Sequence, residues 1–427
     1  MNASIQAVLT EGFNCPMRDV LWGHVYFTPE LSALIDSAPF NRLHRILQLG
    51  PVYHVYPGAT HTRASHSIGV YNLGRRLLQN LAERGVENIS REGALSFLCA
   101  CLLHDLGHFP YTHSLKELPL RSHEDLTGSI IMAEPIKSLV ARCGADPEFT
   151  AAIISEEHTG NYGAELAFYR KLLSGCFDPD KLDYLNRDAR FCGVPYGAQD
   201  VDFIYSRLIP NSERGIDIDS RLIPNVEAIL FAKYLMYRTV YWHRQIRCAT
   251  SMIKKALLCR LESGIINGEE LYNLDDQGLF TLLREKTGAL APSDSLIEAV
   301  WEGNFYPVAA EIPFNSAIHS CLRDIHRRSC HEQLLAEEFQ RAGVPLGSND
   351  VIIDVPEPVS FETGLYVTDE HCGFTESSSA FTIETLNSFV NTLYTIRIFV
   401  NPYFYDKIET LSGLSDILYT KSAWLRS

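Results

Sequence analysis

The chain has 427 residues, of which 46% are hydrophobic and 21% are charged, a composition typical of globular proteins and unlike disordered, collagen-like or coiled-coil chains. At about 150 residues per domain, this length predicts two or three domains. The net charge of −15 argues against a protein that coats nucleic acid or an anionic membrane, but it is compatible with one anionic ligand held in a local basic pocket.

The N-terminal residues and the cysteines indicate a cytoplasmic protein. Residues 1–13 have no basic segment followed by a long apolar run, so they do not resemble a signal peptide. The longest apolar stretch, residues 94–103, is too short to cross a bilayer. The 11 cysteines contain no CxxC pair, which favours reduced thiols over a disulfide framework. We therefore expect no membrane partner.

Most of the first 260 residues have helical patterns. Residues 62–84 place His66 and several apolar side chains at helical spacing. Residues 93–105 are apolar on every side, as expected of a helix at the centre of a domain. Three more segments have helical patterns: 164–173, 180–188 and 226–261. The hexamer SRLIPN occurs at 206–211 and again at 220–225, and we expect the two copies to form a hairpin.

The pattern becomes mixed after about residue 262. We expect a helix over 316–342, followed by strands over 351–355 and 364–368. The predicted fold class is therefore mainly α. We expect residues 1–261 to form a helical domain and residues 262–427 to form a smaller α+β region.

Histidines are concentrated in one part of the chain. Eight of the 15 lie between His44 and His123, where an even distribution would place about three. Within and beyond this stretch the chain contains His66, the pair His104-Asp105 and Asp180 on separate predicted helices. Imidazole and carboxylate groups are suitable ligands for a divalent metal ion. Taken alone, the His-Asp pair is more often a core histidine beside a helix-end acid.

Further motifs occur in a fixed order around these residues. They are Gln48-Leu49-Gly50, the loop 56–61, His104 to His108 with Pro110 and His113, Asp180-Lys181 with Arg187-Asp188, and Arg238 with Tyr241 and His243. Together they resemble the HD-domain deoxynucleoside triphosphate triphosphohydrolases, the family of the vertebrate sterile-alpha-motif-and-HD-domain enzyme and its bacterial relatives. The resemblance covers roughly residues 18–260. It implies an HD-domain helical core, with residues 1–261 as the catalytic domain and residues 262–427 as a region for oligomerisation or regulation. It also implies hydrolysis of a dNTP to a deoxynucleoside and inorganic triphosphate.

The resemblance also implies a metal cofactor. In such enzymes the residues at these positions are ligands, so we expect His66, His104, Asp105 and Asp180 to bind one divalent ion. The candidates are Mn, Fe, Mg, Zn and Co. A metal of this kind polarises a phosphoryl oxygen and activates a bound water.

Catalytic roles follow for the histidines of the central motif, because imidazole titrates near neutral pH. His113 is the expected acid for the leaving group, with His123 in the same network and His108 close to the phosphates. The family often has an acid three residues after the equivalent of His113, where this chain has Lys116. Glu117 is the candidate to replace it.

Substrate-binding residues are expected on both sides of the metal. Arg63 and Lys181 flank ligand motifs and would neutralise phosphate charge. Lys233, Tyr237 and Tyr241 recur every four residues, so we expect them to share one helix face. By resemblance, the remaining contacts to the sugar and phosphates come from four residues: Gln48, Leu49, Tyr184 and Asp188.

The expected partners are the dNTP substrate, a nucleotide activator and further copies of this chain in a homo-oligomer, for which we expect a tetramer. In the vertebrate relative an Asp, a Gln and an Arg recognise guanine between subunits, and the matching positions here are Asp36, Asn41 and His44.

Two other functions remain open. The first is an HD phosphohydrolase that acts on a nucleoside monophosphate, a cyclic nucleotide or a guanosine tetraphosphate. The second is a catalytically silent HD nucleotide sensor, against which the presence of all four expected ligands argues. A substrate panel separates the two kinds of enzyme, and metal analysis tests for the sensor.

Overall fold

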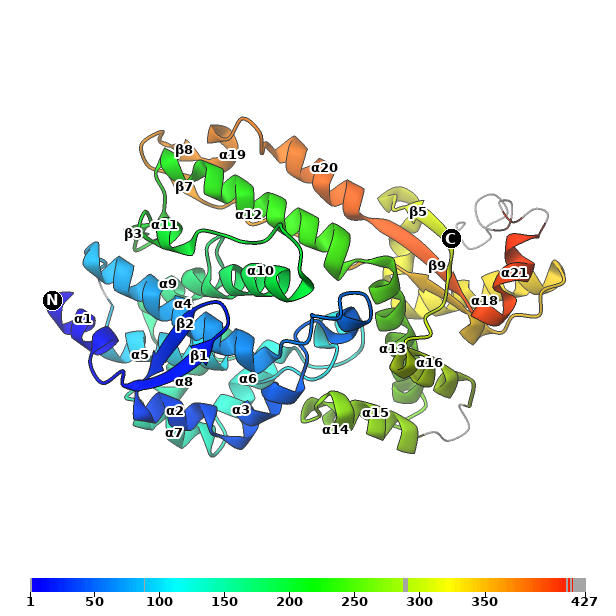
Figure 1. The fold of residues 1–427 in the computed structure, drawn as a ribbon, viewed down its shortest axis with the longest axis horizontal. Coiled ribbons are helices and arrows are strands. Elements are labelled where there is room, and N and C mark those ends of the chain that lie inside the picture. Colours follow the sequence, from blue (N-terminus) through cyan, green and yellow to red (C-terminus); the bar gives the residue numbers. More distant parts are fainter. Residues whose placement is uncertain (1, 88, 287–290, 412–413, 415–416, 418–427) are drawn as a thin grey trace.

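The computed structural model describes residues 2–87, 89–286, 291–411, 414 and 417 and arranges them in two lobes (Figure 1). The last ten residues of the predicted region 262–427 lie outside the described residues. Helices dominate both lobes and the sheets are small, which confirms the mainly α fold with a C-terminal α+β region. No helix in the described part of the chain is both long and apolar enough to span a bilayer.

Helices α4 (Arg63–Glu83), α5 (Arg91–Leu103) and α10 (Pro179–Cys192) form the centre of the first lobe. Helix α4 packs against both α5 and α10. Every residue of α5 from Gly93 to Leu103 is buried, as its apolar sequence predicts. Around this centre lie the other helices of the lobe: α1 (Asn2–Thr10), α2 (Pro29–Ile35), α3 (Ala38–Arg42), α6 (His123–Ile131), α7 (Ile136–Arg142), α8 (Pro147–Ile154), α9 (Gly163–Ser174) and α11 (Val201–Tyr205).

Helix ends place the predicted metal ligands. The Thr62 side chain caps α4 by accepting a hydrogen bond from the Ser65 N–H, which puts His66 in the first turns of the helix. The Asp178 carboxylate caps α10 in the same way, and Asp180 follows in its first turn. His104 is the residue at which α5 ends. The ends of three neighbouring helices therefore bring these ligands together.

The expected helix over 226–261 is interrupted. Helix α12 (Ile223–Met236) continues into a π turn (Tyr237–Tyr241), and α13 (Arg244–Glu262) begins only after His243. The Trp242 N–H donates to the Tyr237 carbonyl, a bond across five residues that widens the helix by one residue. A turn of this kind still brings residues four apart close together, and the rings of Tyr237 and Tyr241 are in contact, with centroids 5.2 Å apart.

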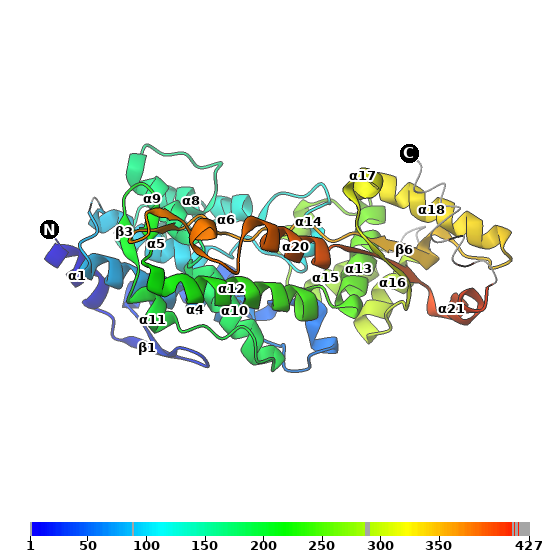
Figure 2. The same ribbon diagram turned by 90° about the horizontal axis from the view of Figure 1, so that it is seen from above.

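The second lobe consists of α13, a three-stranded antiparallel sheet and short helices (Figure 2). In the sheet β9 (Thr395–Val400) lies between β5 (Val308–Pro313) and β6 (Val351–Asp354), with Ile353 opposite Ile398. The helices of the lobe are α14 (Glu269–Tyr272), α15 (Asp276–Glu285), α16 (Ala291–Glu302), α17 (Ser316–His319), α18 (Ile325–Arg341) and α21 (Pro402–Glu409).

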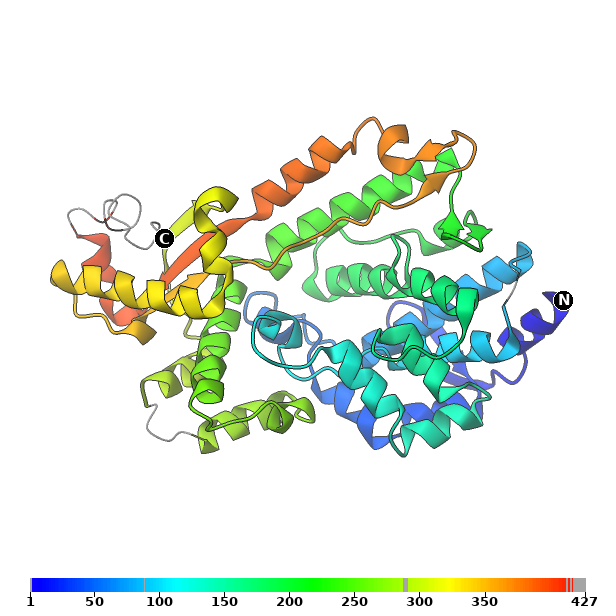
Figure 3. The same ribbon diagram turned by 180° about the vertical axis from the view of Figure 1, so that it is seen from behind.

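Residues 355–394 leave the second lobe, run back along the first lobe and return, as Figure 3 shows from behind. We call them the return segment. It contains β7 (Tyr366–Val367), β8 (Cys372–Gly373), α19 (Phe374–Ser377) and α20 (Ile383–Leu393). Helix α20 lies beside α12, where the rings of Tyr234 and Phe389 stack with centroids 4.4 Å apart. Val367 and Phe374 are fully buried in the core of the first lobe.

The predicted hairpin of the two SRLIPN copies is wrong. The first copy supplies β3 (Ile209–Asn211), but its partner is β4 (Gly215–Asp217) from the segment between the copies. The second copy forms a 3-10 turn and the start of α12 instead. Its proline suits the first turn of a helix, where no N–H donor is needed. A second small hairpin pairs β1 (Cys15–Asp19) with β2 (Gly23–Phe27).

Candidate active site

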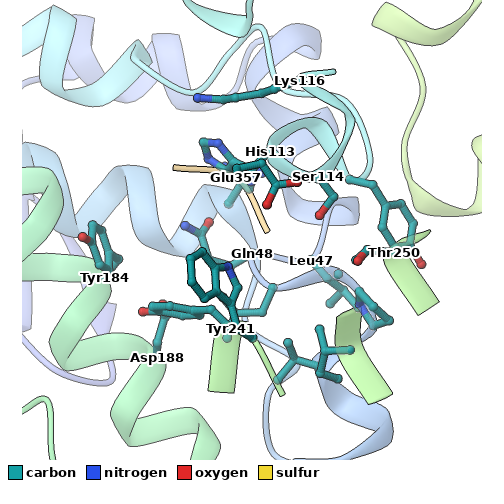
Figure 4. A pocket seen from close by; sticks show the side chains of 18 of the residues that line it. Leu47, Gln48, His113, Ser114, Lys116, Tyr184, Asp188, Tyr241, Thr250 and Glu357 are labelled. Atoms are coloured by element: carbon teal, nitrogen blue, oxygen red, sulfur yellow. The ribbon is translucent and has the colours of Figure 1, made fainter. Parts of the chain in front are cut away.

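A cavity of about 420 Å³ lies between the two lobes (Figure 4). Its walls come from residues 47–52, the first turns of α4 and α10, the loop 111–116, the π turn and α13. The return segment contributes Glu357 and Pro358. The predicted site residues that line it are Gln48, Leu49, Arg63, His66, His104, Asp105, His113, His123, Asp180, Tyr184, Asp188, Tyr237 and Tyr241.

Four of these residues form a cluster suited to a metal ion. One potential metal-binding atom from each of His66, His104 and Asp105 lies within 4.8 Å of the other two. The Asp180 Oδ1 atom is 2.9 Å from His66 Nε2 and 3.9 Å from His104 Nε2. The buried Nε2 atom of His104 has no hydrogen-bond partner. A buried nitrogen left without a partner among carboxylates is the arrangement that a divalent cation would satisfy.

The outer contacts of both histidines aim Nε2 at the cluster. The Nδ1 atom of His66 lies 2.8 Å from Asp183 Oδ2, and Nδ1 of His104 lies 3.0 Å from the Cys101 carbonyl. A proton on each Nδ1 leaves the Nε2 lone pair free for a metal. Asp183 is fixed in turn by Trp22 and Arg187, whose donors lie 2.6 to 2.9 Å from its oxygens. The donor set and its supporting contacts fit a divalent ion.

The charges of the cluster are strongly coupled. Burial lowers the pKa of His66, but hydrogen bonds to Asp180 and Asp183 outweigh it and raise the value to about 10. Burial opposes ionisation of Asp105, yet the neighbouring histidines and arginine hold the pKa of this carboxyl well below its usual range. Arg63 Nη1 donates to Asp105 Oδ2 at 2.8 Å, which fixes the carboxylate beside the cluster.

Three further histidines form a second group beside the first. The ring centroids of His108, His113 and His123 are 3.9 to 5.0 Å apart. Burial and nearby positive charge lower the pKa of all three imidazoles well below the usual value, so the rings are neutral at pH 7. His113 and His123 line the cavity, whereas His108 is fully buried and does not.

Asp188 and Tyr241 mark the other end of the cavity. The Tyr241 hydroxyl donates to Asp188 Oδ2 at 2.6 Å, and His61 Nε2 lies 2.7 Å from Oδ1. The side-chain oxygen of Gln48 is buried without a hydrogen-bond partner, so it is available to accept from a ligand hydroxyl. This end is therefore equipped to bind a small polar group such as a sugar.

Two predicted phosphate cations do not line the cavity. The Nζ atoms of Lys181 and Lys233 lie 3.2 Å and 2.8 Å from Glu362 Oε2, in the return segment. Although burial opposes it, the two lysines lower the pKa of Glu362 to about 2. Both amines therefore share a carboxylate more than a hundred residues further along the chain, and Lys181 also pairs with Asp178 Oδ2 at 3.2 Å.

Glu117 also lies outside the cavity lining. Its carboxylate accepts from Lys254 Nζ at 2.5 Å and from Arg328 Nη2 at 2.6 Å, in the second lobe. The two cations overcome the effect of burial and lower the pKa of Glu117. Lys116, the residue that replaces the family acid, lines the cavity instead.

Sequence reasoning missed several residues of the site. Asp183 follows Asp180 by three positions on the same helix, a spacing that signals a shared face. The sequence marks Lys116 only as a basic residue at a position where the family often has an acid. Arg247 and Glu357 line the cavity and pair with each other at 2.7 Å, but no sequence signal brings two residues so far apart together.

Comparison with known proteins matches most of the chain to two family models. Residues 63–188 match the HD domain, and residues 205–415 match the HD associated region. The second match crosses the predicted boundary between residues 261 and 262, as the return segment crosses between the lobes.

Three relatives illustrate the range of similarity. An uncharacterized protein of Mycoplasma pneumoniae, the MG461 homolog, is 33% identical over 242 residues, which cover 52% of this chain and 55% of that protein. The human deoxynucleoside triphosphate triphosphohydrolase SAMHD1 is 29% identical over 394 residues, covering 79% of this chain and 62% of that one. A hypothetical protein from Aquifex aeolicus of solved structure has a TM-score of 0.69 and 26% identity, with 92% of this chain and 98% of that chain covered. The chain spans about half the length of the first curated relatives it matches.

Proposed function

We propose that this chain, a member of the HD-domain family, is a metal-dependent hydrolase that cleaves a dNTP into a deoxynucleoside and inorganic triphosphate. The observation that carries the proposal is the combination of two features in one cavity. A metal-ligand cluster lies beside two neutral histidines, and the pair of Asp188 and Tyr241 lies apart from them. The cavity volume of about 420 Å³ suits a small-molecule ligand.

In this proposal His66, His104, Asp105 and Asp180 hold one divalent ion. Such an ion polarises a phosphoryl oxygen and lowers the pKa of a bound water. Arg63 holds Asp105 in place and presents the rest of its guanidinium to an anionic ligand. Asp183 orients His66 from outside the cluster.

His113 is the proposed general acid, with the ring of His123 beside it at a centroid distance of 5.0 Å. Both rings are neutral without a ligand. A triphosphate adds negative charge beside them, which favours the imidazolium form and prepares a proton for the leaving oxygen. The leaving group of this reaction is the sugar oxygen, so His113 donates at the bond between sugar and triphosphate.

The sugar binds at the other end of the cavity. Asp188 accepts from the 3′-hydroxyl, and the Tyr241 ring packs against the sugar face while its hydroxyl orients Asp188. Gln48 and Leu49 lie against the sugar, and the free side-chain oxygen of Gln48 accepts a further hydrogen bond. Tyr184 and Tyr237 complete this wall.

The deciding experiment resolves the products of a nucleotide panel. Purified protein is incubated with each dNTP and with Mn, Fe, Mg, Zn or Co, and the products are separated by ion exchange. Inorganic triphosphate and deoxynucleoside in equal amounts support the proposal. Pyrophosphate with a monophosphate, or no turnover of any dNTP with any metal, refutes it.

Two extensions of the experiment address the other functions. Nucleoside monophosphates, cyclic nucleotides and guanosine tetraphosphate in the same panel test for a different HD phosphohydrolase. Metal analysis of the purified protein tests for a silent sensor, because a sensor does not require one ion per chain.

We also propose that the protein assembles into a homo-oligomer, with a tetramer as the expected form, and responds to a nucleotide activator. The human relative is a dNTP triphosphohydrolase of similar sequence. Asp36 and Asn41, the positions matched to the guanine-recognising residues of the vertebrate relative, are in contact within the chain. The Asn41 side-chain amide donates to the Asp36 backbone carbonyl at 2.9 Å. Light scattering with and without added nucleotides measures the mass, and a monomer under all conditions contradicts this proposal.

A further inference from the structure

Three cationic side chains line the cavity, and two of them are already paired with carboxylates. Arg63 donates to Asp105 at 2.8 Å. Arg247 lies 2.6 and 2.7 Å from two carboxylates of the second lobe and the return segment. Within the described ranges, Lys116 is the lining cation with neither an ion pair nor a side-chain hydrogen bond. Its charge is therefore available to a ligand.

The position of Lys116 directs this charge at the histidine end of the cavity. The residue is exposed and follows the 3-10 turn Thr112–Leu115. In Figure 4 its side chain extends above His113, on the side away from Asp188 and Tyr241. Burial is the main cause of the lowered pKa of His113, and the Lys116 ammonium group adds a smaller effect in the same direction.

Lys181 and Lys233 are poorly placed to take the same role. Besides Glu362, Lys181 donates to the Gly175 carbonyl and Lys233 to the Ser360 carbonyl, each at 2.7 Å. Both side chains are almost completely buried. Glu362 is only partly buried, but moving either amine to a ligand would break a charge-assisted contact of a buried lysine, which is costly.

The overall charge of the cavity makes an unpaired cation important. The lining contains three cations and four carboxylates, the latter being Asp105, Asp180, Asp188 and Glu357. With a divalent ion bound in the cluster, where His66 must be neutral to act as a ligand, these charges sum to +1. Without Lys116 the sum would return to zero, and a polyanion would lose the attraction that draws it into the cavity.

We propose that Lys116 is the binding group for the outer phosphates of a polyphosphate ligand, acting with Arg63, while Lys181 and Lys233 fasten the return segment. The ligand class rests on the proposed function, in which the sugar lies at Asp188 and the phosphates extend past the metal cluster. The departure of this chain from the family acid thus supplies a phosphate cation in the cavity.

The test measures binding of inorganic triphosphate to the metal-loaded protein by titration calorimetry. Lys116→Met is expected to weaken binding by at least about tenfold, since it removes a charge-assisted hydrogen bond. Lys116→Arg keeps the charge and is expected to restore most of the affinity. The control is Lys137→Met, which alters another exposed lysine, in α7 and outside the cavity lining, and should leave the affinity unchanged. Unchanged affinity in Lys116→Met, or a loss in Lys116→Arg as large as in Lys116→Met, overturns the proposal.

A second variant tests the role given to the buried lysines. Glu362→Gln removes the ion-pair partner of Lys233 and leaves Lys181 with Asp178 alone, at 3.2 Å, without touching Lys116. We expect its affinity for triphosphate to match that of the parent protein, whose folding is compared by thermal denaturation. Tighter binding in Glu362→Gln, together with parental affinity in Lys116→Met, assigns the phosphates to the buried lysines and overturns the proposal.

The outcomes also separate this inference from the proposed function. A protein that binds triphosphate through Lys116 but leaves every dNTP intact supports the subsite and refutes the proposed reaction. A protein that releases triphosphate from a dNTP with the same KM in Lys116→Met as in the parent supports the reaction and refutes the subsite.

Discussion

Replacing Asp183 by asparagine removes the charge behind the metal centre without touching a metal ligand. The two oxygens of Asp183 receive His66 Nδ1 at 2.8 Å, Trp22 Nε1 at 2.6 Å and two Arg187 nitrogens at 2.8 and 2.9 Å. An asparagine offers one acceptor oxygen and places an amide N–H₂ against donors at the other position. His66 loses the negative partner that strengthens it as a ligand.

The expected loss is about 10- to 100-fold in metal affinity, which corresponds to about 1.4 to 2.7 kcal/mol. Mn or Zn bound to Asp183→Asn is measured after dialysis against graded chelator, beside the parent protein. The control is Asp19→Asn, because Asp19 pairs with the same Arg187 at 2.9 Å but does not contact His66. Parental metal affinity in Asp183→Asn, or an equal loss in Asp19→Asn, would refute the reasoning.

Three more variants are informative. Asp105→Ala is expected to abolish both metal retention and turnover, and full activity in this variant would show that the cluster is not the reaction centre. Tyr241→Phe removes the hydroxyl held 2.6 Å from Asp188 and is expected to raise KM for a deoxynucleotide by about tenfold, whereas an unchanged KM would contradict the sugar site. Burial raises the pKa of Asp276 from 3.8 to about 6. Between these two pH values the folded state keeps a proton that the unfolded state releases. The free energy of unfolding therefore falls as the pH rises from about 3.8 to about 6. Asp276→Asn is therefore expected to be more stable than the parent by up to about 3 kcal/mol at pH 7.5. This difference should disappear as the pH falls below 3.8, and denaturation curves whose difference does not change with pH would contradict the reasoning.

The family resemblance supplied the four proposed metal ligands, and local signals at helix ends account for where the structure places them. The cap residues Thr62 and Asp178 fix where two of the helices begin, and the breakers after His104 fix where the third ends. Local rules of this kind act over a few residues, so one sequence suffices to read them. The fold class followed from the same rules.

The ion pairs between distant segments were not predictable. Helical spacing placed Lys233 beside Tyr237 and Tyr241, but it contained no information about Glu362, 129 residues further along the chain. The same spacing could not reveal the π turn, which depends on one changed backbone hydrogen bond. Pairings of this kind are set by tertiary packing, which periodicity does not encode.

The path of the return segment gives the order of synthesis a role in folding. Lys233 leaves the ribosome 129 residues ahead of the carboxylate that neutralises it, a delay of about 10 s at common rates of translation. Over that interval the first lobe also lacks Val367 and Phe374, which later fill its core. The lobe that contributes all four proposed metal ligands and most of the cavity walls therefore reaches its final packing only near the end of translation. For the same reason, a fragment that stops at residue 261 would be a poor substitute for the catalytic unit.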